Sequence, residues 1–293
     1  MILEDWVPVR VSLVLSNMYP TPHEILITLF VDGVQREFSI DDKPGFVRLF
    51  RIGPSTSVEG ELLIPELQHG FHSVVVLAIL EPYQAVRGLA VLDTWGMHSI
   101  ARRLEFTVGH TSAPSTAMPE TPTTAVSPTY PDLHGALLSE GPEEPVGWLG
   151  GSWHLGDKRF YVHLGNQTGR TEEYLVTLLV DWRQVALDPA NGVQRGYVVL
   201  EPGEIRSLAA SVSLPSSFGR HSVVALAFNQ PYSSLLAVPV VGVVEDTHRV
   251  YLRSLLPWLL LAGGVMSGVC AVAFLLIKHR RKEKPTWTSR VSH

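Results

Sequence analysis

The chain has 293 residues and a formal net charge of −5, and hydrophobic residues make up 45% of it. This length suits two domains of about 100 residues each and a shorter additional segment. Residues 278–293 carry six Lys or Arg and one Glu, so the rest of the chain has a net charge of −10, which argues against a nucleic-acid partner. The single cysteine, Cys270, excludes an intrachain disulfide, so the domains must rely on hydrophobic cores.

The N-terminal residues Met1 to Pro8 contain no basic segment, no long apolar run and no small-residue cleavage site. They do not match a secretory signal peptide. Two topologies therefore stay open. The chain is exported by a signal that this sequence does not show, or it is anchored at its C-terminal end with its bulk in the cytosol.

An internal repeat appears when the chain is compared with itself at an offset of 149 residues. Three blocks match: 26–32 with 175–181, 70–83 with 219–232, and Asn17 with Asn166. The longest block has nine identities in fourteen positions. Because separate blocks share one ungapped offset, we expect two copies of one domain.

Each copy has the pattern of strands with one buried face. Apolar residues alternate with others in a first strand: Val11, Leu13 and Leu15 in the first copy, and Phe160, Val162 and Leu164 in the second. This period of two is typical of half-buried β-strands. Continuous runs rich in β-branched residues indicate central strands. We therefore predict an all-β fold with two tandem Ig-like β-sandwich domains, residues 1–108 and 151–248.

The hairpin after the second of these strands is expected to differ between the copies. Asp32-Gly33 is a tight-turn signal in the first copy, because glycine adopts a positive φ angle without strain. The second copy has Asp181-Trp182 at the same offset. A tryptophan there predicts another turn geometry.

Residues 109–150, between the copies, have a different composition. The stretch 112–129 is almost wholly Ser, Thr, Pro and Ala. Such a segment cannot bury enough apolar surface to offset its ordering entropy. We expect 109–150 to be a flexible linker that lets the first copy swing away from the second.

The second copy resembles CARDB-like modules, which are Ig-like sandwiches of prokaryotic surface proteins related in shape to fibronectin type III domains. The resemblance rests on a turn Asn (Asn166), a strand ending in Asp181, Pro202-Gly203-Glu204 before an alternating strand, and a Gly-x-His-x-Val strand at 219–223. The first copy lacks the Pro-Gly-Glu and matches mainly at Asp32 and 70–78. The resemblance implies the fold and an exported, prokaryotic context, and it carries over no catalytic or binding residue.

A search for reactive motifs returns few candidates. His72 and His221 recur at the repeat offset, but neither has a second ligand nearby in sequence, so a structural role is favoured over metal binding. The patterns Gly-x-Ser-x-Gly, Ser-x-x-Lys, Gly-x-Gly-x-x-Gly and the P-loop are absent. Glu172-Glu173 is interpreted as solvated surface. We predict no enzyme, no cofactor and no metal site.

Asn166-Gln167-Thr168 is an N-glycosylation sequon, but its counterpart at Asn17 is not one. The shared asparagine favours a role in the turn. Aromatic side chains are candidates for binding or for burial, and the sequence does not decide between the two. They are Trp148, Trp153, Trp182, Tyr83 and Tyr232.

The segment Ser254 to Ile277 contains no charged residue. Its 24 residues suffice to cross a hydrocarbon core of about 30 Å as a helix. The alternative, a buried core helix, rarely has this apolar length. Gly264 and Gly268 form a Gly-x-x-x-Gly pattern on which two such helices could pack as a homodimer.

The tail 278–293 begins with a basic cluster that orients the segment before it: Lys278, Arg280, Arg281, Lys282 and Lys284. Basic residues next to a membrane helix stay in the cytoplasm. We therefore expect a single-pass protein of the cytoplasmic membrane with both copies outside. A tail-anchored protein with cytosolic domains is the alternative.

The leading functional hypothesis is a membrane-anchored, non-catalytic structural or interaction protein that acts in adhesion, envelope assembly or scaffolding. Its partners would be the lipid bilayer and one or more proteins of unknown identity. A second hypothesis is an accessory subunit of a larger membrane enzyme or transporter. A third is a carbohydrate-binding module, which predicts a row of exposed aromatic side chains on one sheet face.

Overall fold

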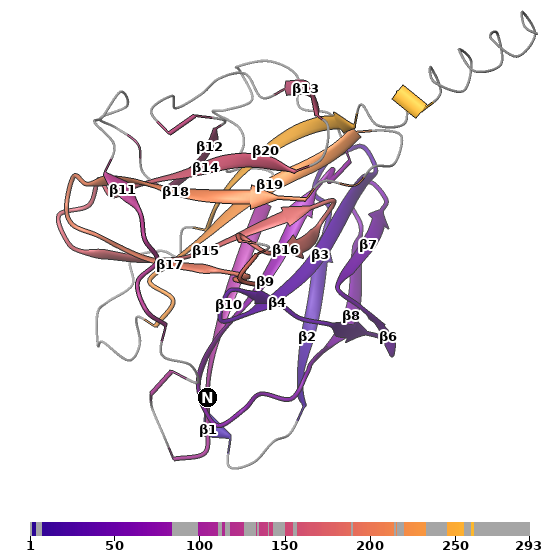
Figure 1. Cartoon of the computed structure of the whole chain (residues 1–293). Coiled ribbons are helices and arrows are strands. Elements are labelled where there is room, and N and C mark those ends of the chain that lie inside the picture. Colours follow the sequence, from indigo (N-terminus) through magenta and orange to yellow (C-terminus); the bar gives the residue numbers. More distant parts are fainter. Residues whose placement is uncertain are drawn as a thin grey trace, which may run out of the picture.

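The computed structural model describes residues 2–3, 8–83, 99–110, 113–114, 118–125, 133, 135–139, 141–142, 150–154, 157–188, 190–213, 215, 220–232, 245–254 and 259–260. Its alternating and β-branched segments form strands that pair into four sheets (Figure 1). The described strands pair in antiparallel fashion apart from two short parallel pairs, β1 with β10 and β13 with β20.

The first copy consists of two sheets, which we call sheet A and sheet B. Sheet A runs in the order β1 (Ile2–Leu3), β10 (Ser99–Val108), β9 (Gly70–Leu80), β3 (His23–Val31) and β4 (Val34–Gln35), and β7 (Val47–Ile52) also pairs with β3. Sheet B runs β2 (Val9–Ser16), β8 (Ser57–Ile64), β5 (Phe38–Ile40) and β6 (Lys43–Gly45). One apolar core, including Leu15, Ile27 and Val74, fills the space between them.

The second copy repeats this plan as sheet C and sheet D. Sheet C runs β11 (Thr124–Ala125), β18 (Ile205–Val212), β14 (Lys158–Gly165) and β12 (Gly135–Ser139). Sheet D runs β13 (Gly150–His154), β20 (Glu245–Ser254), β19 (Arg220–Asn229), β15 (Glu172–Val180) and β16 (Arg183–Val185), and β17 (Gly196–Leu200) also pairs with β15. Phe160, Val176 and Val223 belong to its core.

The structural repeat follows the sequence repeat. The bounds of β14 and β15 are those of β2 and β3 shifted by 149 residues. Each copy faces two largely antiparallel sheets across one apolar core, which is the arrangement of an Ig-like β-sandwich. The prediction of two such sandwiches is thus confirmed, while the outer limits 1–108 and 151–248 stay predictions.

The two hairpins are alike, so the prediction of a different turn in the second copy is wrong. Asp32 and Gly33 have φ angles of 51° and 74°, and Asp181 and Trp182 have φ angles of 48° and 67°. Positive φ at both central residues is the geometry of a two-residue type I′ turn. Trp182 therefore adopts a backbone conformation that normally favours glycine.

Part of the predicted linker is strand. β11 and β12 lie inside 109–150, and both pair with strands of sheet C. All five residues of β12 are buried, so the linker prediction is wrong for this segment. The alternating apolar side chains of Ala136 and Leu138 enter the core of the second copy, which supplies the burial that the surrounding Ser, Thr and Pro residues lack.

No helix in the described ranges is long and apolar enough to cross a membrane. The expected spanning segment 254–277 lies outside the described residues, apart from Ser254 and the helical residues Leu259 and Leu260. Gly264, Gly268 and the basic tail with Lys278, Arg280, Arg281, Lys282 and Lys284 also lie outside them. These predictions stay as they were made.

Candidate functional site

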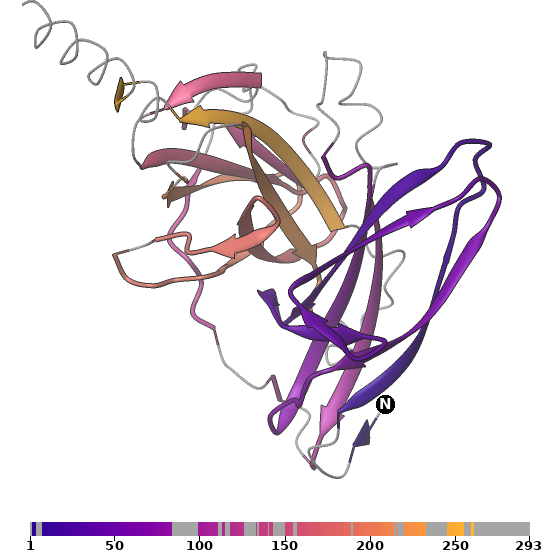
Figure 2. The ribbon, with the colours of Figure 1, turned by 90° about the vertical axis from the view of Figure 1, so that its right-hand side faces the viewer.

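The most extensive site in the described residues is the surface on which the two copies meet. Figure 2 shows the indigo-to-purple strands of the first copy against the pink-to-gold strands of the second. The outward faces of sheets A and D pack together there through buried apolar side chains. These are Leu26, Phe30, Val75, Leu77, Ile79, Leu175, Leu179, Trp182, Val224, Leu226 and Phe228. We call this surface the A–D interface.

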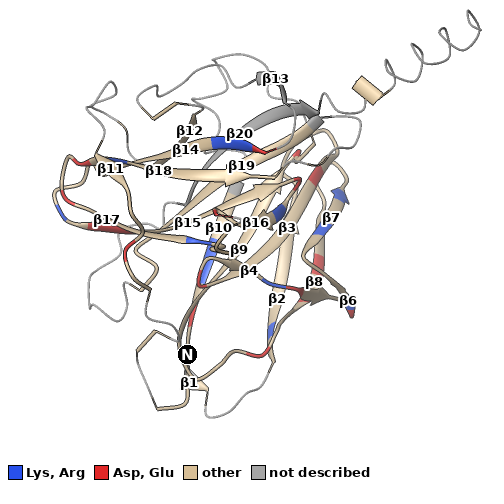
Figure 3. Ribbon diagram, in the orientation of Figure 1, with Lys and Arg blue, Asp and Glu red and all other residues tan. Residues whose placement is uncertain are grey.

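The apolar content of the interface follows from the strand pattern. β3 and β9 are buried on both faces, since alternate residues point into the sandwich core and into the interface. Strand β9 contains no Lys, Arg, Asp or Glu (Figure 3). Continuous apolar runs of this kind mark strands without a solvated face. The expectation that the first copy swings away from the second is therefore wrong.

Two glutamines at equivalent positions form the polar centre of the interface. The backbone N–H of Gln35 donates to Oε1 of Gln184 at 2.5 Å, and the backbone N–H of Gln184 donates to Oε1 of Gln35 at 2.8 Å. Gln35 Nε2 also donates to the carbonyl oxygen of Trp182, and Gln184 Nε2 to that of Gly33. Each contact has its counterpart at the offset of 149, so the copies are related by an approximate two-fold axis.

The glutamines are held by the strands behind them. Gln35 Nε2 donates to Thr28 Oγ1 at 2.9 Å, and Gln184 Nε2 donates to Thr177 Oγ1 at 2.6 Å. Buried amides need such partners, since an unmade hydrogen bond there costs about 1–3 kcal/mol. Thr28 and Thr177 belong to the matching blocks of the sequence repeat, but the glutamines were missed. Their identity at the repeat offset was the available signal.

Three arginines contact the opposite copy at the border of the interface. Arg103 donates to the carbonyl oxygens of Asn229 at 2.6 Å and Gln230 at 2.8 Å. Arg195 donates to the carbonyl oxygen of Asp32. The guanidinium of Arg183 lies 4.4 Å from the ring centroid of Phe46, which is cation–π geometry.

Trp182 breaks the symmetry of the interface. Its indole is 2% exposed and fills the apolar cluster from the hairpin of the second copy. At the equivalent Gly33, a Cβ atom would lie 3.3 Å from Cβ of Leu175, so even an alanine there would require Leu175 to shift. The indole of Trp182 on one side and the small Gly33 on the other complete the packing of the A–D interface.

The hairpin aspartates bind the recurring histidines. Asp32 Oδ2 lies 2.8 Å from Nδ1 of His72, and Asp181 Oδ2 lies 2.7 Å from Nδ1 of His221. Each aspartate also accepts the backbone N–H of the serine that follows its histidine, Ser73 or Ser222. His72 Nε2 contacts the carbonyl oxygen of Gln68 at 2.8 Å. Both ring nitrogens thus face acceptors. Burial lowers the pKa of His72, but these hydrogen bonds outweigh it and raise the pKa above 6.5.

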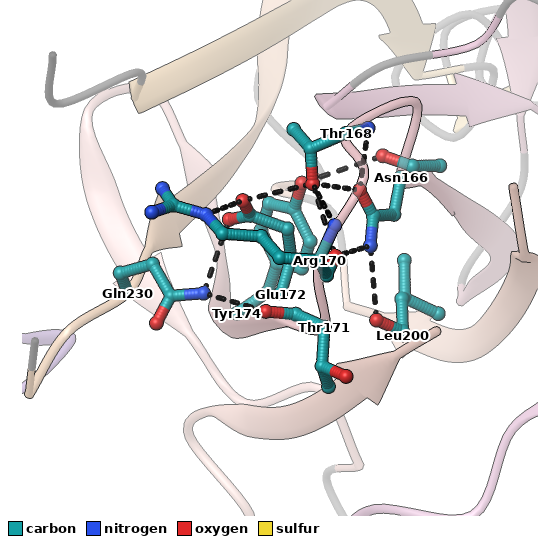
Figure 4. A network of polar contacts seen from close by, with 9 residues as sticks. Asn166, Thr168, Arg170, Thr171, Glu172, Tyr174, Leu200 and Gln230 are labelled. Atoms are coloured by element: carbon teal, nitrogen blue, oxygen red, sulfur yellow. Dashed lines mark hydrogen bonds and ion pairs between the residues drawn. The ribbon is translucent and has the colours of Figure 1, made fainter. Parts of the chain in front are cut away.

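Glu172 is fully buried, so its interpretation as solvated surface is wrong. Figure 4 shows it among Thr168, Arg170 and Gln230. Burial raises its pKa, but hydrogen bonds from Arg170 and Gln230 lower it further than burial raises it, and the net pKa is below 4.5. Gln230, whose side chain donates to Glu172, offers its backbone carbonyl to Arg103 of the first copy. The carboxylate therefore supports the border of the A–D interface.

The asparagines act in turns, as favoured from the repeat. Asn166 is buried, and its Nδ2 donates to the carbonyl oxygens of Arg170 and Leu200, while Oδ1 accepts the N–H of Thr168. Asn17 makes the equivalent contacts with Thr21, Ile52 and Tyr19, and its Nδ2 also donates to the carbonyl oxygen of Gly53. A glycan on Asn166 would have to displace these bonds.

The aromatic candidates separate into buried and exposed groups. Trp182 lies in the A–D interface, and Tyr232 packs there against Phe71 with ring centroids 6.2 Å apart. Burial raises the pKa of Tyr232 to about 12. Tyr83 is exposed. Trp148 and the side chain of Trp153 lie outside the described residues.

Within the described part of the chain, no three His, Cys, Asp or Glu side chains form a group that could hold a metal ion. The histidines, carboxylates and amides described above are hydrogen-bonded to one another and to the backbone of turns.

No family model and no curated protein matches the chain. Two solved structures are among those that match the chain. A transglutaminase of red sea bream shares 11% identity over 86% of this chain, with a TM-score of 0.24, and the chain spans 30% of that protein. The chaperone DraB of E. coli shares 12% identity over 86% of this chain and 94% of its own, also with a TM-score of 0.24.

Proposed function

We propose that the protein is a membrane-anchored, non-catalytic interaction protein whose two Ig-like copies form one rigid unit outside the cytoplasmic membrane. The observation that carries the proposal is the A–D interface, with its reciprocal glutamines and shared apolar cluster. Two sandwiches fixed in this way present their remaining surfaces in a constant relative orientation. That property suits adhesion, envelope assembly or scaffolding.

The anchor is supported by sequence alone: the uncharged segment 254–277 and the basic cluster that begins at Lys278. The CARDB-like relationship is likewise part of the proposal, supported by Asn166, Pro202-Gly203-Glu204 and the strand at 219–223. Gly203 has a φ angle of 75°, and its N–H donates to the carbonyl oxygen of Asn166, so the turn at Asn166 and the turn at 202–204 are hydrogen-bonded to each other.

The carbohydrate-binding hypothesis receives no support from the described residues. Their strongly exposed aromatic side chains are Tyr19, in a turn after β2, and Tyr83, after β9. They do not form a row on one sheet face.

The test is protease accessibility on intact cells with a tag at each end of the chain. The proposal expects the two copies to be cleaved while the tag after His293 survives. Protection of the copies with loss of the C-terminal tag would support the tail-anchored alternative instead. Purification in mild detergent then separates a free interaction protein from an accessory subunit, which would appear in a stoichiometric complex.

A further inference from the structure

The two copies differ at one sheet edge. In the second copy, β14 lies between β18 and β12 (Figure 1). In the first copy, the equivalent strand β2 pairs with β8, and no other described strand pairs with it. The repeat thus contains the same edge twice, once covered by a strand and once with no described strand beside it.

The side chains of β14 and β2 differ in burial as this difference in pairing predicts. Phe160, Val162 and Leu164 of β14 are fully buried. Of their equivalents in β2, Val11 and Leu13 are only half-buried, whereas Leu15 is buried. On the other face, His163 is 1% exposed and bonds Ser139 of β12 at 2.6 Å, whereas the equivalent Val14 is 56% exposed. The absence of a β12 counterpart among the described residues leaves apolar surface on both sides of β2.

The facing strand of sheet A, β10, is partly apolar on its sandwich side. Leu104 of β10 pairs with Val74, which points into the sandwich core, and it is half-buried. Ile100 pairs with Ala78 on the same face and is 59% exposed. Residues directly opposite in an antiparallel pair share a face, so Ile100 and Leu104 line the sandwich side of β10, with the exposed Arg102 between them.

Strand β2 lacks the usual protection of an exposed edge. It has eight residues, no proline and one charged residue, Arg10, which is paired with Glu61 (Figure 3). Natural edge strands are commonly blocked by charge, proline or a bulge. Met18 and Tyr19, just after β2, add exposed apolar surface at its end. An uncovered edge with these features is suited to strand addition.

We propose that β2 is a binding site for an extended segment of a partner polypeptide, which adds to sheet B as an antiparallel strand in the place that β12 takes in sheet C. This proposal rests on the proposed interaction function and names the class of partner. The register follows from β12: Ala136 pairs with Leu164 and Leu138 with Val162. The partner would place a small residue opposite Leu15 and a larger aliphatic residue opposite Leu13, both directed into the space between sheets A and B.

The test uses a peptide with the sequence of residues 133–141, which contains β12, and hydrogen exchange of the full-length protein. Saturating peptide should slow amide exchange in 9–16 at least tenfold and leave 158–165 unchanged. A peptide carrying Leu138→Asp should bind at least tenfold more weakly. Val14→Lys, on an exposed side chain, should weaken binding of the unchanged peptide about tenfold, whereas the control Val193→Lys, on an exposed residue of the second copy, should not.

Equal binding of the two peptides, or no protection of 9–16, would overturn the proposal. Protection of 158–165 instead would show that the peptide replaces β12 in the second copy and would also overturn it. Concentration-dependent protection of 9–16 without peptide would assign the edge to a second copy of this chain. Each of these results leaves the protease-accessibility test of the proposed function unaffected.

Discussion

His72 shows how a single buried group makes the fold sensitive to pH. Its two ring nitrogens contact Asp32 and the carbonyl oxygen of Gln68, so the charged imidazolium fits the site better than the neutral ring. Its pKa in the folded chain is raised above the 6.5 of an exposed histidine. A raised pKa means that the folded state binds the proton more tightly than the unfolded state does.

The stabilisation from His72 is therefore complete below about pH 6.5 and lost as the pH rises through the higher folded pKa. We expect the urea midpoint to fall over that window. Asp32→Asn should remove most of this pH dependence, whereas substitution of the exposed His110 by Gln should not change it. Urea unfolding across the pH range measures this, and an unchanged slope in Asp32→Asn would contradict the assignment.

The pKa shift of Glu172 has the opposite sign to that of His72. Its pKa in the folded chain is lowered, so its stabilisation is present above about pH 4.5 and lost as the pH falls through the folded value. Glu172→Gln should lower the free energy of unfolding at pH 7 by about 2 kcal/mol, because Arg170 and Gln230 lose a charged acceptor. Thermal unfolding at pH 7 and pH 4 tests this against the exposed control Glu59→Gln. A control variant that lost as much stability would refute a special role for Glu172.

At the scale of the element, the two hairpins have the same backbone conformation but different side chains. Asp32-Gly33 and Asp181-Trp182 adopt the same turn, although one glycine is replaced by the largest side chain. Burial of the indole in the A–D interface compensates for the unfavourable φ angle of 67°. Local propensity predicted a different turn, and tertiary packing overrode it.

Trp182→Ala should destabilise the protein by about 3 kcal/mol, because it leaves a cavity in the interface. Trp182→Gly should be about 1 kcal/mol less destabilising than the alanine variant, since glycine relieves the positive φ angle. Glycine normally destabilises regular structure more than alanine does. A glycine variant that is more stable than the alanine variant would therefore indicate that residue 182 is held at a strained φ angle. Chemical denaturation of both variants gives the comparison, and the usual order would show that the turn is not strained.

Strand identity was largely predictable, but strand β12 was not. The repeat and the period of two located β2, β3, β9 and their counterparts, because these depend on local pattern. β12 is five residues long and lies among Pro, Ser and Thr, and its burial depends on β14, which comes later in the chain. The polar site was missed for a similar reason, since Gln35 and Gln184 meet only after both copies have folded.

At the scale of the whole molecule, the A–D interface makes the two copies one unit. Its glutamine pair and most of its apolar residues obey the approximate two-fold relation that a symmetric dimer would show, whereas Trp182 and the three arginines do not. A duplicated domain that binds its own copy needs no partner to cover that sheet face. The apolar faces of sheets A and D are therefore used internally, and the outer edges are left for other contacts.

The glutamine pair provides a thermodynamic test of this relation. Gln35→Ala and Gln184→Ala should each destabilise by about 2 kcal/mol, since each leaves buried groups of the other without partners. The double variant should destabilise by at least about 1 kcal/mol less than the sum. Gln194→Ala, an exposed glutamine, is the control. Additive effects in urea unfolding would mean that the two side chains do not interact.

The distance between the copies in solution tests the central claim most directly. Spin labels at Glu59→Cys in the first copy and Ser211→Cys in the second, both exposed positions, can be placed in a Cys270→Ser background. Pulsed electron spin resonance on the detergent-solubilised chain should give one narrow distance distribution, because the A–D interface fixes the copies. A broad distribution, as expected for sandwiches moving independently on a linker, would contradict the account.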